Sequence, residues 1–276
     1  MDKNLEVVTQ LLQTKAAQIR LSILDAIYAA GKGHIGGAFS IVDILVSLFY
    51  DNKLKFDASD PQSSDRDRFI LSKGHAGIAL YAVLADLGFF SAEEMQFVNK
   101  GRLLGEHPDP RIPGVETVGG SLGHGLSFGA GVALAAKMDG EKRRHVVLVG
   151  DGECYEGSVW EAAMFSGHQK LSNLCVIVDR NGLITHGPTE GFNKLEPFSS
   201  KWEAFGWEVV EIDGHDYEQL DLAWRRFINA DRNSPLAIIA KTLKGKGVPF
   251  MEDKAEWHHG GIDDFKYVEA RKALRQ

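Results

Sequence analysis

The sequence predicts an α/β fold: a doubly wound, mostly parallel sheet with helices on both faces, built as a single domain over residues 1–276. Two observations predict it. Apolar runs of strand length alternate along the chain with stretches of helical length. Several strand runs are continuous in Val, Ile and Leu, as in HVVLV at 145–149 and LCVIV at 174–178. Such runs are typical of parallel strands that are buried on both faces.

The N-terminal half of the chain is predicted to be mainly helical. Apolar residues recur at helical spacing over residues 5–30, and Gly31 and Gly33 are expected to end this helix. Ser40–Asp43 and Ser91–Glu94 match capping boxes, so a helix is expected to begin at each. The other elements expected here are a strand at 68–73, a helix at 77–87, a loop at 101–125 and a helix at 126–138.

The second half of the chain alternates strands and helices more regularly. Gly129 and Gly131 lie inside the helix at 126–138. Each costs about 1 kcal/mol relative to alanine, so we expect both to pack closely against a neighbour. A loop is expected from the strand at 174–178 to Pro197, and a segment rich in Gly, Lys and His covers 241–261. The other expected elements are strands at 145–149, 208–212 and 236–240 and helices at 157–169, 199–205, 217–228 and after 261.

Composition excludes several classes of protein. The chain has 276 residues, 44% of them apolar, with 38 acidic against 31 basic residues and a net charge of −7. This balance argues against nucleic-acid and acidic-membrane partners. The N-terminus does not resemble a signal peptide, and no apolar run is long enough to span a bilayer. Cys154 and Cys175 have no C-x-x-C spacing, so we expect a cytoplasmic protein without a disulfide framework or a zinc site.

Polar residues follow two of the predicted strands. Gly150, Asp151 and Gly152 come directly after the strand at 145–149, and Asn181 lies just beyond the strand at 174–178. Gly-Asp-Gly alone is more often a simple turn. However, ligands of parallel sheets bind at the carboxyl ends of the strands, where Asp151 and Asn181 can meet. Together with a backbone carbonyl they form an oxygen set suited to Mg²⁺ or Ca²⁺, and the glycines let backbone amides approach a phosphate.

This pattern resembles the motif of the thiamine-diphosphate enzymes, in which GDG is followed about thirty residues later by an asparagine. The resemblance implies a thiamine-diphosphate-binding fold. It also implies that Asp151, Asn181 and the carbonyl of Leu183 hold Mg²⁺ or Ca²⁺, that the Gly152 amide contacts the cofactor diphosphate, and that Gly150 belongs to the same turn.

Six separate motifs, spread over nearly the whole chain, resemble those of transketolases. They are centred, in chain order, on His34 in GKGHIGG, His75 in LSKGHAG, His107 in GEHP, the loop GSLGHG at 120–125, Asp151 in GDG, and His259 in WHHGG. Three positions depart from the family pattern and are expected to alter the edge of the pocket: Ile35, Ser121 and His124.

The resemblance implies roles for four histidines. His34, His75, His107 and His259 would line the substrate channel, bind sugar hydroxyls and assist proton transfer, which suits imidazole near neutral pH. His75 and His259 would also contact the cofactor. His258 is the alternative to His259, which is preferred because it directly precedes a glycine.

Four further residues match family positions. Gly120 and Leu122 would contact the aminopyrimidine side of the cofactor. Glu156 and Glu161 match acids at the subunit interface, and Glu156 is also expected among the cofactor-binding residues. For these two acids an ordinary exposed helix face is an equally good reading. His186 and Cys154 are expected to have no role in the chemistry.

The resemblance covers only the diphosphate-binding half of a transketolase. We therefore expect the chain to be the N-terminal subunit of a split enzyme, inactive without a separately encoded C-terminal subunit that supplies the pyrimidine-binding domain, most simply as α2β2. The implied reaction transfers a two-carbon ketol unit from a ketose or ketose phosphate to an aldose or aldose phosphate.

Three alternatives stay open. One is a subunit of another thiamine-diphosphate enzyme, such as a 2-oxoacid dehydrogenase or a deoxyxylulose-phosphate synthase. The second is a non-catalytic protein that binds thiamine diphosphate. The third, a nicotinamide dehydrogenase, is disfavoured because the first strand-to-helix turn has no G-x-G-x-x-G.

Overall fold

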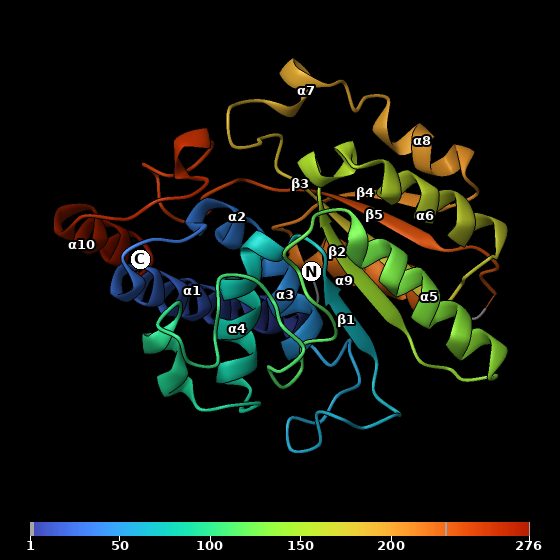
Figure 1. Ribbon diagram of the computed structural model, residues 1–276, viewed down its shortest axis with the longest axis horizontal. Helices are drawn as coiled ribbons and strands as arrows, with labels where there is room; N and C mark the ends of the chain where they lie inside the picture. The colour runs from blue at the N-terminus through green and yellow to red at the C-terminus, as the bar shows by residue number, and fades with distance from the viewer. Residues whose placement is uncertain (1–2, 230, 276) are drawn as a thin grey trace.

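The computed structural model describes residues 3–229 and 231–275, and its centre is one five-stranded parallel sheet (Figure 1). The strands follow the order β1-β2-β3-β5-β4, and each neighbouring pair is parallel. Their bounds are Arg68–Leu71 (β1), His145–Gly150 (β2), Leu174–Arg180 (β3), Glu208–Asp213 (β4) and Leu236–Lys241 (β5). The predicted fold class is confirmed. Residues 1, 2, 230 and 276 of the predicted domain lie outside the described residues.

Helices cover both faces of the sheet (Figure 1). One face carries α1 (Lys3–Ala30), α3 (Val42–Tyr50), α4 (Gly77–Asp86) and α9 (Tyr217–Ile228), and the other carries α5 (His124–Met138), α6 (Gly157–His168) and α8 (Phe198–Ala204). Shorter elements are α2 (Ile35–Ser40), α7 (Thr189–Phe192), α10 (Asp264–Ala273) and the 3₁₀ turns η1 (Gly74–Ala76), η2 (Ala92–Phe97), η3 (Gly152–Tyr155) and η4 (Ala255–Trp257). Within the described residues, no helix combines the length and apolar character needed to cross a bilayer.

The central strands are buried on both faces, as their continuous apolar runs predict. Successive side chains of β2 point to opposite sides. Val146 and Leu148 join the apolar core beneath α1, α3, α4 and α9, whereas Val147 and Val149 join the core beneath α5, α6 and α8. This double burial leaves the carboxyl ends of the strands, with the loops that follow them, as the place where polar groups can gather.

The predicted capping boxes are corrected by the structure. Ser40 is the last residue of α2, and its hydroxyl donates to Asp179 at 2.8 Å instead of capping a helix. Asp43 lies in the first turn of α3, where it forms a buried ion pair with Arg20 at 2.6 Å. At Ser91 the hydroxyl does accept from an amide, that of Glu93, but the element that follows is the 3₁₀ turn η2. In the first case, tertiary partners took both side chains of the predicted cap.

The two glycines inside α5 differ. A Cβ on Gly129 would lie 2.4 Å from Cγ2 of Val147, so this glycine lets the helix approach β2 and the predicted close packing is confirmed. A Cβ on Gly131 would have no heavy atom within 4 Å, and the residue is exposed. The prediction for Gly131 is therefore wrong, because it faces away from the sheet.

Candidate functional site

The predicted acid and asparagine lie at the ends of neighbouring strands. β2 pairs with β3 in a register that places Gly150 opposite Asp179, so Asp151 and Asn181 follow side by side. The Asp151 carboxylate is buried and accepts from the amides of Gly152, at 2.7 Å, and Gly182, at 2.6 Å. The geometric expectation drawn from the sequence, that these residues meet at one edge of the sheet, is correct.

The electrostatics of Asp151 call for a nearby cation. Burial, and then the negative charge of Asp179, raise the pKa of the Asp151 carboxyl. One cation already lies beside it, the Arg180 guanidinium at 3.2 Å. A metal ion on the open side of the carboxylate would stabilise its charged form further, because an opposite charge within about 4–6 Å favours ionisation.

The side chain of Asn181 is held in one orientation. Its amide nitrogen donates to Asp179 at 2.8 Å, and its amide oxygen accepts from the backbone N–H of Leu183 at 3.0 Å. The carbonyl of Leu183 lies 3.5 Å from the ammonium nitrogen of Lys244. The three oxygens on Asp151, Asn181 and Leu183 are hard donors, so the set fits Mg²⁺ or Ca²⁺.

These three residues line one cavity of about 170 Å³ at the carboxyl end of the sheet. Glycine backbone, positive charge and imidazole surround it, which suits a diphosphate. Gly152 lines it too, and a Cβ there would lie 2.5 Å from Cγ2 of Ile184, so the turn leaves little room for a larger residue. The other lining residues are Gly37, Lys73, His75, Leu122, Gly150, Glu153, Ile184, Thr185, Lys244 and His258.

A buried ion pair that was not predicted from the sequence underlies this cavity. The ammonium group of Lys73 contacts the carboxylate of Asp179 at 2.5 Å and donates to the carbonyl of Gly37 at 2.8 Å. Although burial alone would raise it, the pKa of Asp179 is lowered by the charge of Lys73 and by its hydrogen bonds. The pair ties the end of β1, the end of β3 and the start of α2 together.

Glu153 links the GDG turn to the loop before α5. Its carboxylate is buried and accepts from the amides of Gly123, at 2.8 Å, and Gly150, at 2.9 Å, and from the hydroxyl of Ser72. Burial raises the pKa of this carboxyl. Glu153 thereby positions the GSLGHG loop against the strand end that carries Asp151.

A lysine and a histidine close the cavity from the C-terminal tail. Lys244 Nζ lies 2.8 Å from Nδ1 of His258. Burial, and then the charge of Lys73, lower the pKa of Lys244 to about 8. Burial, and then the charge of Lys244, lower the pKa of His258 to about 3, so its imidazole is neutral near pH 7.

The predicted histidines lie together beside this cavity. The ring of His34 lies 5.3 Å from that of His75 and 6.3 Å from that of His107. His258 lies 5.1 Å from His75, and His259 lies 4.4 Å from His34. Burial is the main cause that lowers the pKa of His34 to about 4 and that of His75 well below its usual value. These two rings are therefore neutral hydrogen-bonding groups near pH 7.

Of the two adjacent histidines in the tail, the structure places His258 in the cavity wall. His259, which was preferred from the sequence, is more exposed, and its Nε2 lies 3.1 Å from the carboxylate of Glu106 outside the cavity lining. The backbone of the η4 turn, which ends just before His258, decides which ring turns inward.

The remaining predicted residues divide in a similar way. Leu122 lines the cavity, whereas Gly120, Glu156 and Glu161 are exposed and outside its lining. His186 is exposed. Cys154 is buried in the core beneath α5 and α6, where burial raises its thiol pKa well above the usual value, and Cys175 is buried as well.

Sequence reasoning missed Lys73, Asp179, Glu153 and Lys244. A signal existed for the first two, because each directly follows an apolar strand run, as Asp151 does. For Glu153 and Lys244, which lie in a short turn and a Lys-rich tail, the sequence has no feature that separates them from solvated surface charges.

Comparisons with known proteins agree with this geometry. Residues 12–275 match the family described as "Transketolase, thiamine diphosphate binding domain". One of the proteins named as subunits of apulose-4-phosphate transketolase, from Phocaeicola vulgatus, is 41% identical over 268 residues, which cover 97% of this chain and 95% of that protein. The 6-deoxy-6-sulfo-D-fructose transketolase subunit SqwG of Clostridium sp. is 41% identical over 250 residues, 90% of each protein.

Solved structures show the same relationship. The transketolase of Campylobacter jejuni superposes with a TM-score of 0.90 at 31% identity, over 96% of this chain and 43% of that one. The chain thus spans less than half of this transketolase, but almost the full length of the two subunit proteins. On the family match and these identities, the chain belongs to the transketolase family and corresponds to its thiamine-diphosphate-binding domain.

Proposed function

We propose that the chain is the N-terminal, diphosphate-binding subunit of a two-chain, thiamine-diphosphate-dependent transketolase, with residues 1–276 as one domain. The observation that carries the proposal is the position of the Asp151, Asn181 and Leu183 oxygens in one cavity with His75 and His258, beside His34. The reaction would transfer a two-carbon ketol unit from a ketose or ketose phosphate to an aldose or aldose phosphate.

The cavity residues divide by chemistry. Asp151, Asn181 and Leu183 would hold Mg²⁺ or Ca²⁺, and the amide of Gly152 would donate to the diphosphate. Lys244, with its lowered pKa, lies where a phosphate oxygen would restore its full charge. When bound, thiamine diphosphate supplies the electron sink for cleavage of the ketose carbon–carbon bond.

The histidines would act on the sugar. His34, His75 and His107 form a row of rings that can donate to, or accept from, hydroxyl groups, because an imidazole carries one donor and one acceptor. On the cofactor side of this row we place His258 in preference to His259, since His258 lines the cavity.

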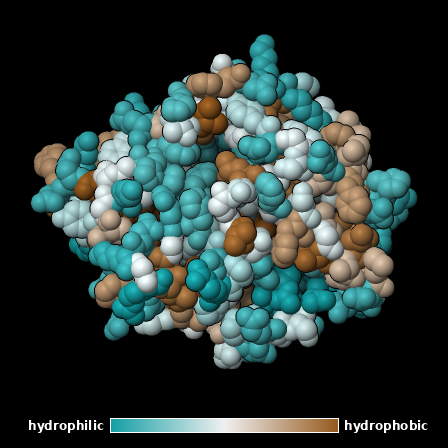
Figure 2. Space-filling view, in the orientation of Figure 1, coloured by the Kyte–Doolittle hydropathy of each residue, from teal (hydrophilic) through white to brown (hydrophobic). Residues whose placement is uncertain are grey.

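A partner surface is available on the face away from α1. Figure 2 shows apolar surface over α5 and α6. Exposed apolar side chains there are Phe128 (40% exposed), Met138 (78%), Met164 (56%) and Phe165 (40%). Gly120, Glu156 and Glu161 are exposed in neighbouring segments. Exposed apolar patches of this kind mark protein interfaces, which supports assembly with a C-terminal subunit, most simply as α2β2.

The experiment is to co-express the chain with a separately encoded C-terminal transketolase subunit, then to assay ketol transfer with thiamine diphosphate and Mg²⁺. We expect transfer by the pair and none by either chain alone. A panel of ketose phosphates, sulfonated and non-phosphorylated ketoses would assign the donor, since the two 41% identical relatives are named for different sugars. Failure of an assembled pair on every ketose would contradict the proposed reaction. The cytoplasmic location stays a prediction.

A further inference from the structure

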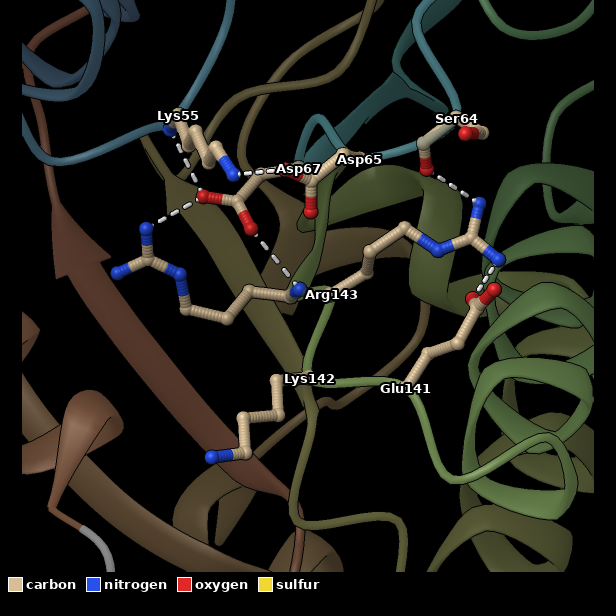
Figure 3. Close-up of a pocket in the computed structure, with 8 residues that line it drawn as sticks. Lys55, Ser64, Asp65, Asp67, Glu141, Lys142 and Arg143 are labelled. Atoms are coloured by element: carbon tan, nitrogen blue, oxygen red, sulfur yellow. Dashed lines mark hydrogen bonds and ion pairs between the residues drawn. The ribbon is translucent and has the colours of Figure 1, made fainter.

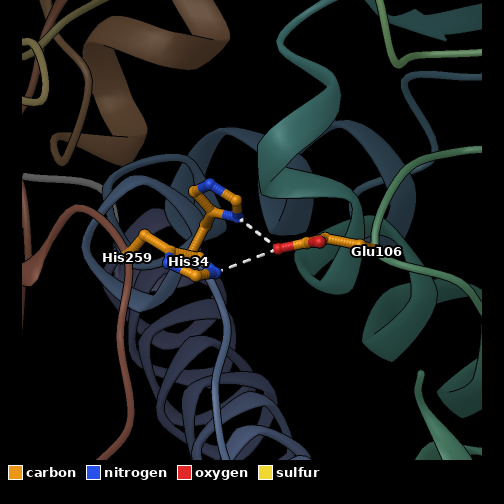
Figure 4. A group of neighbouring side chains, drawn as sticks. All are labelled: His34, Glu106 and His259. Atoms are coloured by element: carbon orange, nitrogen blue, oxygen red, sulfur yellow. Dashed lines mark hydrogen bonds and ion pairs between the residues drawn. The ribbon is translucent and has the colours of Figure 1, made fainter. Parts of the chain in front are cut away.

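Three side chains from distant parts of the chain converge at the rim of the histidine row. His34 precedes α2, Glu106 lies in the loop before α5, and His259 follows η4. Figure 4 shows both imidazoles pointing toward the Glu106 carboxylate. Its Oε1 lies 3.3 Å from Nδ1 of His34 and 3.1 Å from Nε2 of His259, and the possible ligand atoms all lie within 4.8 Å of one another.

One atom of this group lacks a satisfactory partner. Nδ1 of His34 is buried, and among the residues that the structure describes it has no hydrogen bond of acceptable geometry. The Glu106 oxygen approaches it to 3.3 Å without forming such a bond. A buried polar atom without a partner carries a free-energy cost of about 1–3 kcal/mol, so a ligand at this position would be stabilising.

We propose that His34, Glu106 and His259 form a binding site for a divalent transition-metal ion such as Zn²⁺. Two imidazole nitrogens and one carboxylate oxygen suit zinc and its neighbours better than Mg²⁺ or Ca²⁺. Ligand atoms 3.1 and 3.3 Å apart match tetrahedral coordination at metal–ligand distances of about 2.0–2.2 Å. The fourth position is open to water or to a substrate oxygen.

This site differs from the oxygen site at Asp151 in both chemistry and consequence. An ion here would use Nδ1 of His34 and would join three loops at the entrance to the cavity. It would therefore compete with any ligand that needs that imidazole, and transition metals at low concentration would block the entrance. The alternative is that Glu106 simply accepts hydrogen bonds from the two rings.

The test is a Co²⁺ titration of the full chain, with any affinity tag removed, after chelation and in excess Mg²⁺ so that the oxygen site is filled. Co²⁺ is a spectroscopic probe for zinc sites. We expect visible absorption bands that saturate at one Co²⁺ per chain and disappear when Zn²⁺ is added. Glu106→Ala and His259→Ala should each weaken Co²⁺ binding at least about tenfold, since even outer-shell changes cost 10–100-fold.

Two controls sharpen the result. His186→Ala, which removes an exposed histidine elsewhere, and Asp151→Ala should both bind Co²⁺ as the wild type does. Circular dichroism of each variant checks its fold. Saturation without visible bands, or unchanged Co²⁺ affinity in folded His259→Ala and Glu106→Ala, would overturn the proposal. The test needs neither partner subunit nor turnover, so its failure leaves the proposed transketolase function standing.

Discussion

The two ends of the sheet both gather charged side chains, yet they are built differently. At the amino end, a pocket of about 600 Å³ is lined by Lys55, Ser64, Asp65, Asp67, Glu141, Lys142, Arg143 and Arg144 (Figure 3). At the carboxyl end the cavity is smaller, about 170 Å³, and carries the candidate site. Pocket size alone would therefore point to the wrong end of the molecule.

Burial and pairing separate the two ends. In the amino-end pocket the ion pair between Lys55 and Asp65 joins side chains that are 61% and 78% exposed, where water screens both charges. At the carboxyl end, the side chains of Lys73 and Asp179 are 3% and 0% exposed. Burying such charges is costly, so their retention at one edge indicates that the edge does chemistry.

The largest expected effect concerns Asp151. Asp151→Ala in the assembled enzyme should abolish Mg²⁺-dependent binding of thiamine diphosphate, because it removes the only carboxylate among the three proposed metal ligands. Calorimetric titration of the cofactor with and without Mg²⁺ measures this. Asp65→Ala, at the amino end, should bind the cofactor as the wild type does. Normal Mg²⁺-dependent binding by Asp151→Ala would remove the metal-site assignment.

The second effect compares the two lysines directly. Lys73→Met leaves Asp179 buried without its charge partner, and breaking a buried pair in this way costs about 3–5 kcal/mol of unfolding free energy. Lys55→Met, at the exposed pair, should leave stability essentially unchanged. Urea denaturation of both variants measures the difference. Equal stability of the two variants would mean that burial does not distinguish the two ends.

The sequence was sufficient for the sheet and for one side of the site. Continuous apolar runs predicted β2 and β3, and the polar residues that follow them predicted Asp151 and Asn181. The same rule applies to Lys73 and Asp179, but a strand-end lysine looks solvated until a partner 106 residues away is placed beside it. The choice between His258 and His259 depended on the backbone of a short turn, for which WHHGG has no periodic signal.

A third prediction uses a histidine at the amino end. His145 is 1% exposed, and burial, followed by the charges of Arg143 and Arg68, lowers its pKa to about 4, although Asp67 opposes the shift. Its neutral form is favoured in the fold, so this contribution is complete above the unfolded pKa of 6.5 and is lost as pH falls toward 4. The full loss is roughly 3 kcal/mol.

His145→Val removes this titrating group. Its unfolding free energy should therefore fall less steeply than that of the wild type between pH 6.5 and 4. Urea denaturation at several pH values measures both slopes. Parallel slopes would show that His145 does not titrate differently in the folded and unfolded chains, and that strong pKa shifts are confined to the carboxyl end.

The smallest effect concerns α5, which leads from the GSLGHG loop at the carboxyl end toward the start of β2. Gly129→Ala would place a methyl group 2.4 Å from Val147, and overpacking of this kind costs about 1–3 kcal/mol. Gly131→Ala meets no atom within 4 Å, so it should stabilise the chain by up to about 1 kcal/mol through helix propensity. Thermal unfolding of the two variants measures the contrast. If both were destabilising, Gly131 would also be needed by the fold. If only Gly129→Ala were, the glycines of this helix would be explained by packing against β2, and the functional glycines would be those of the strand-end turn.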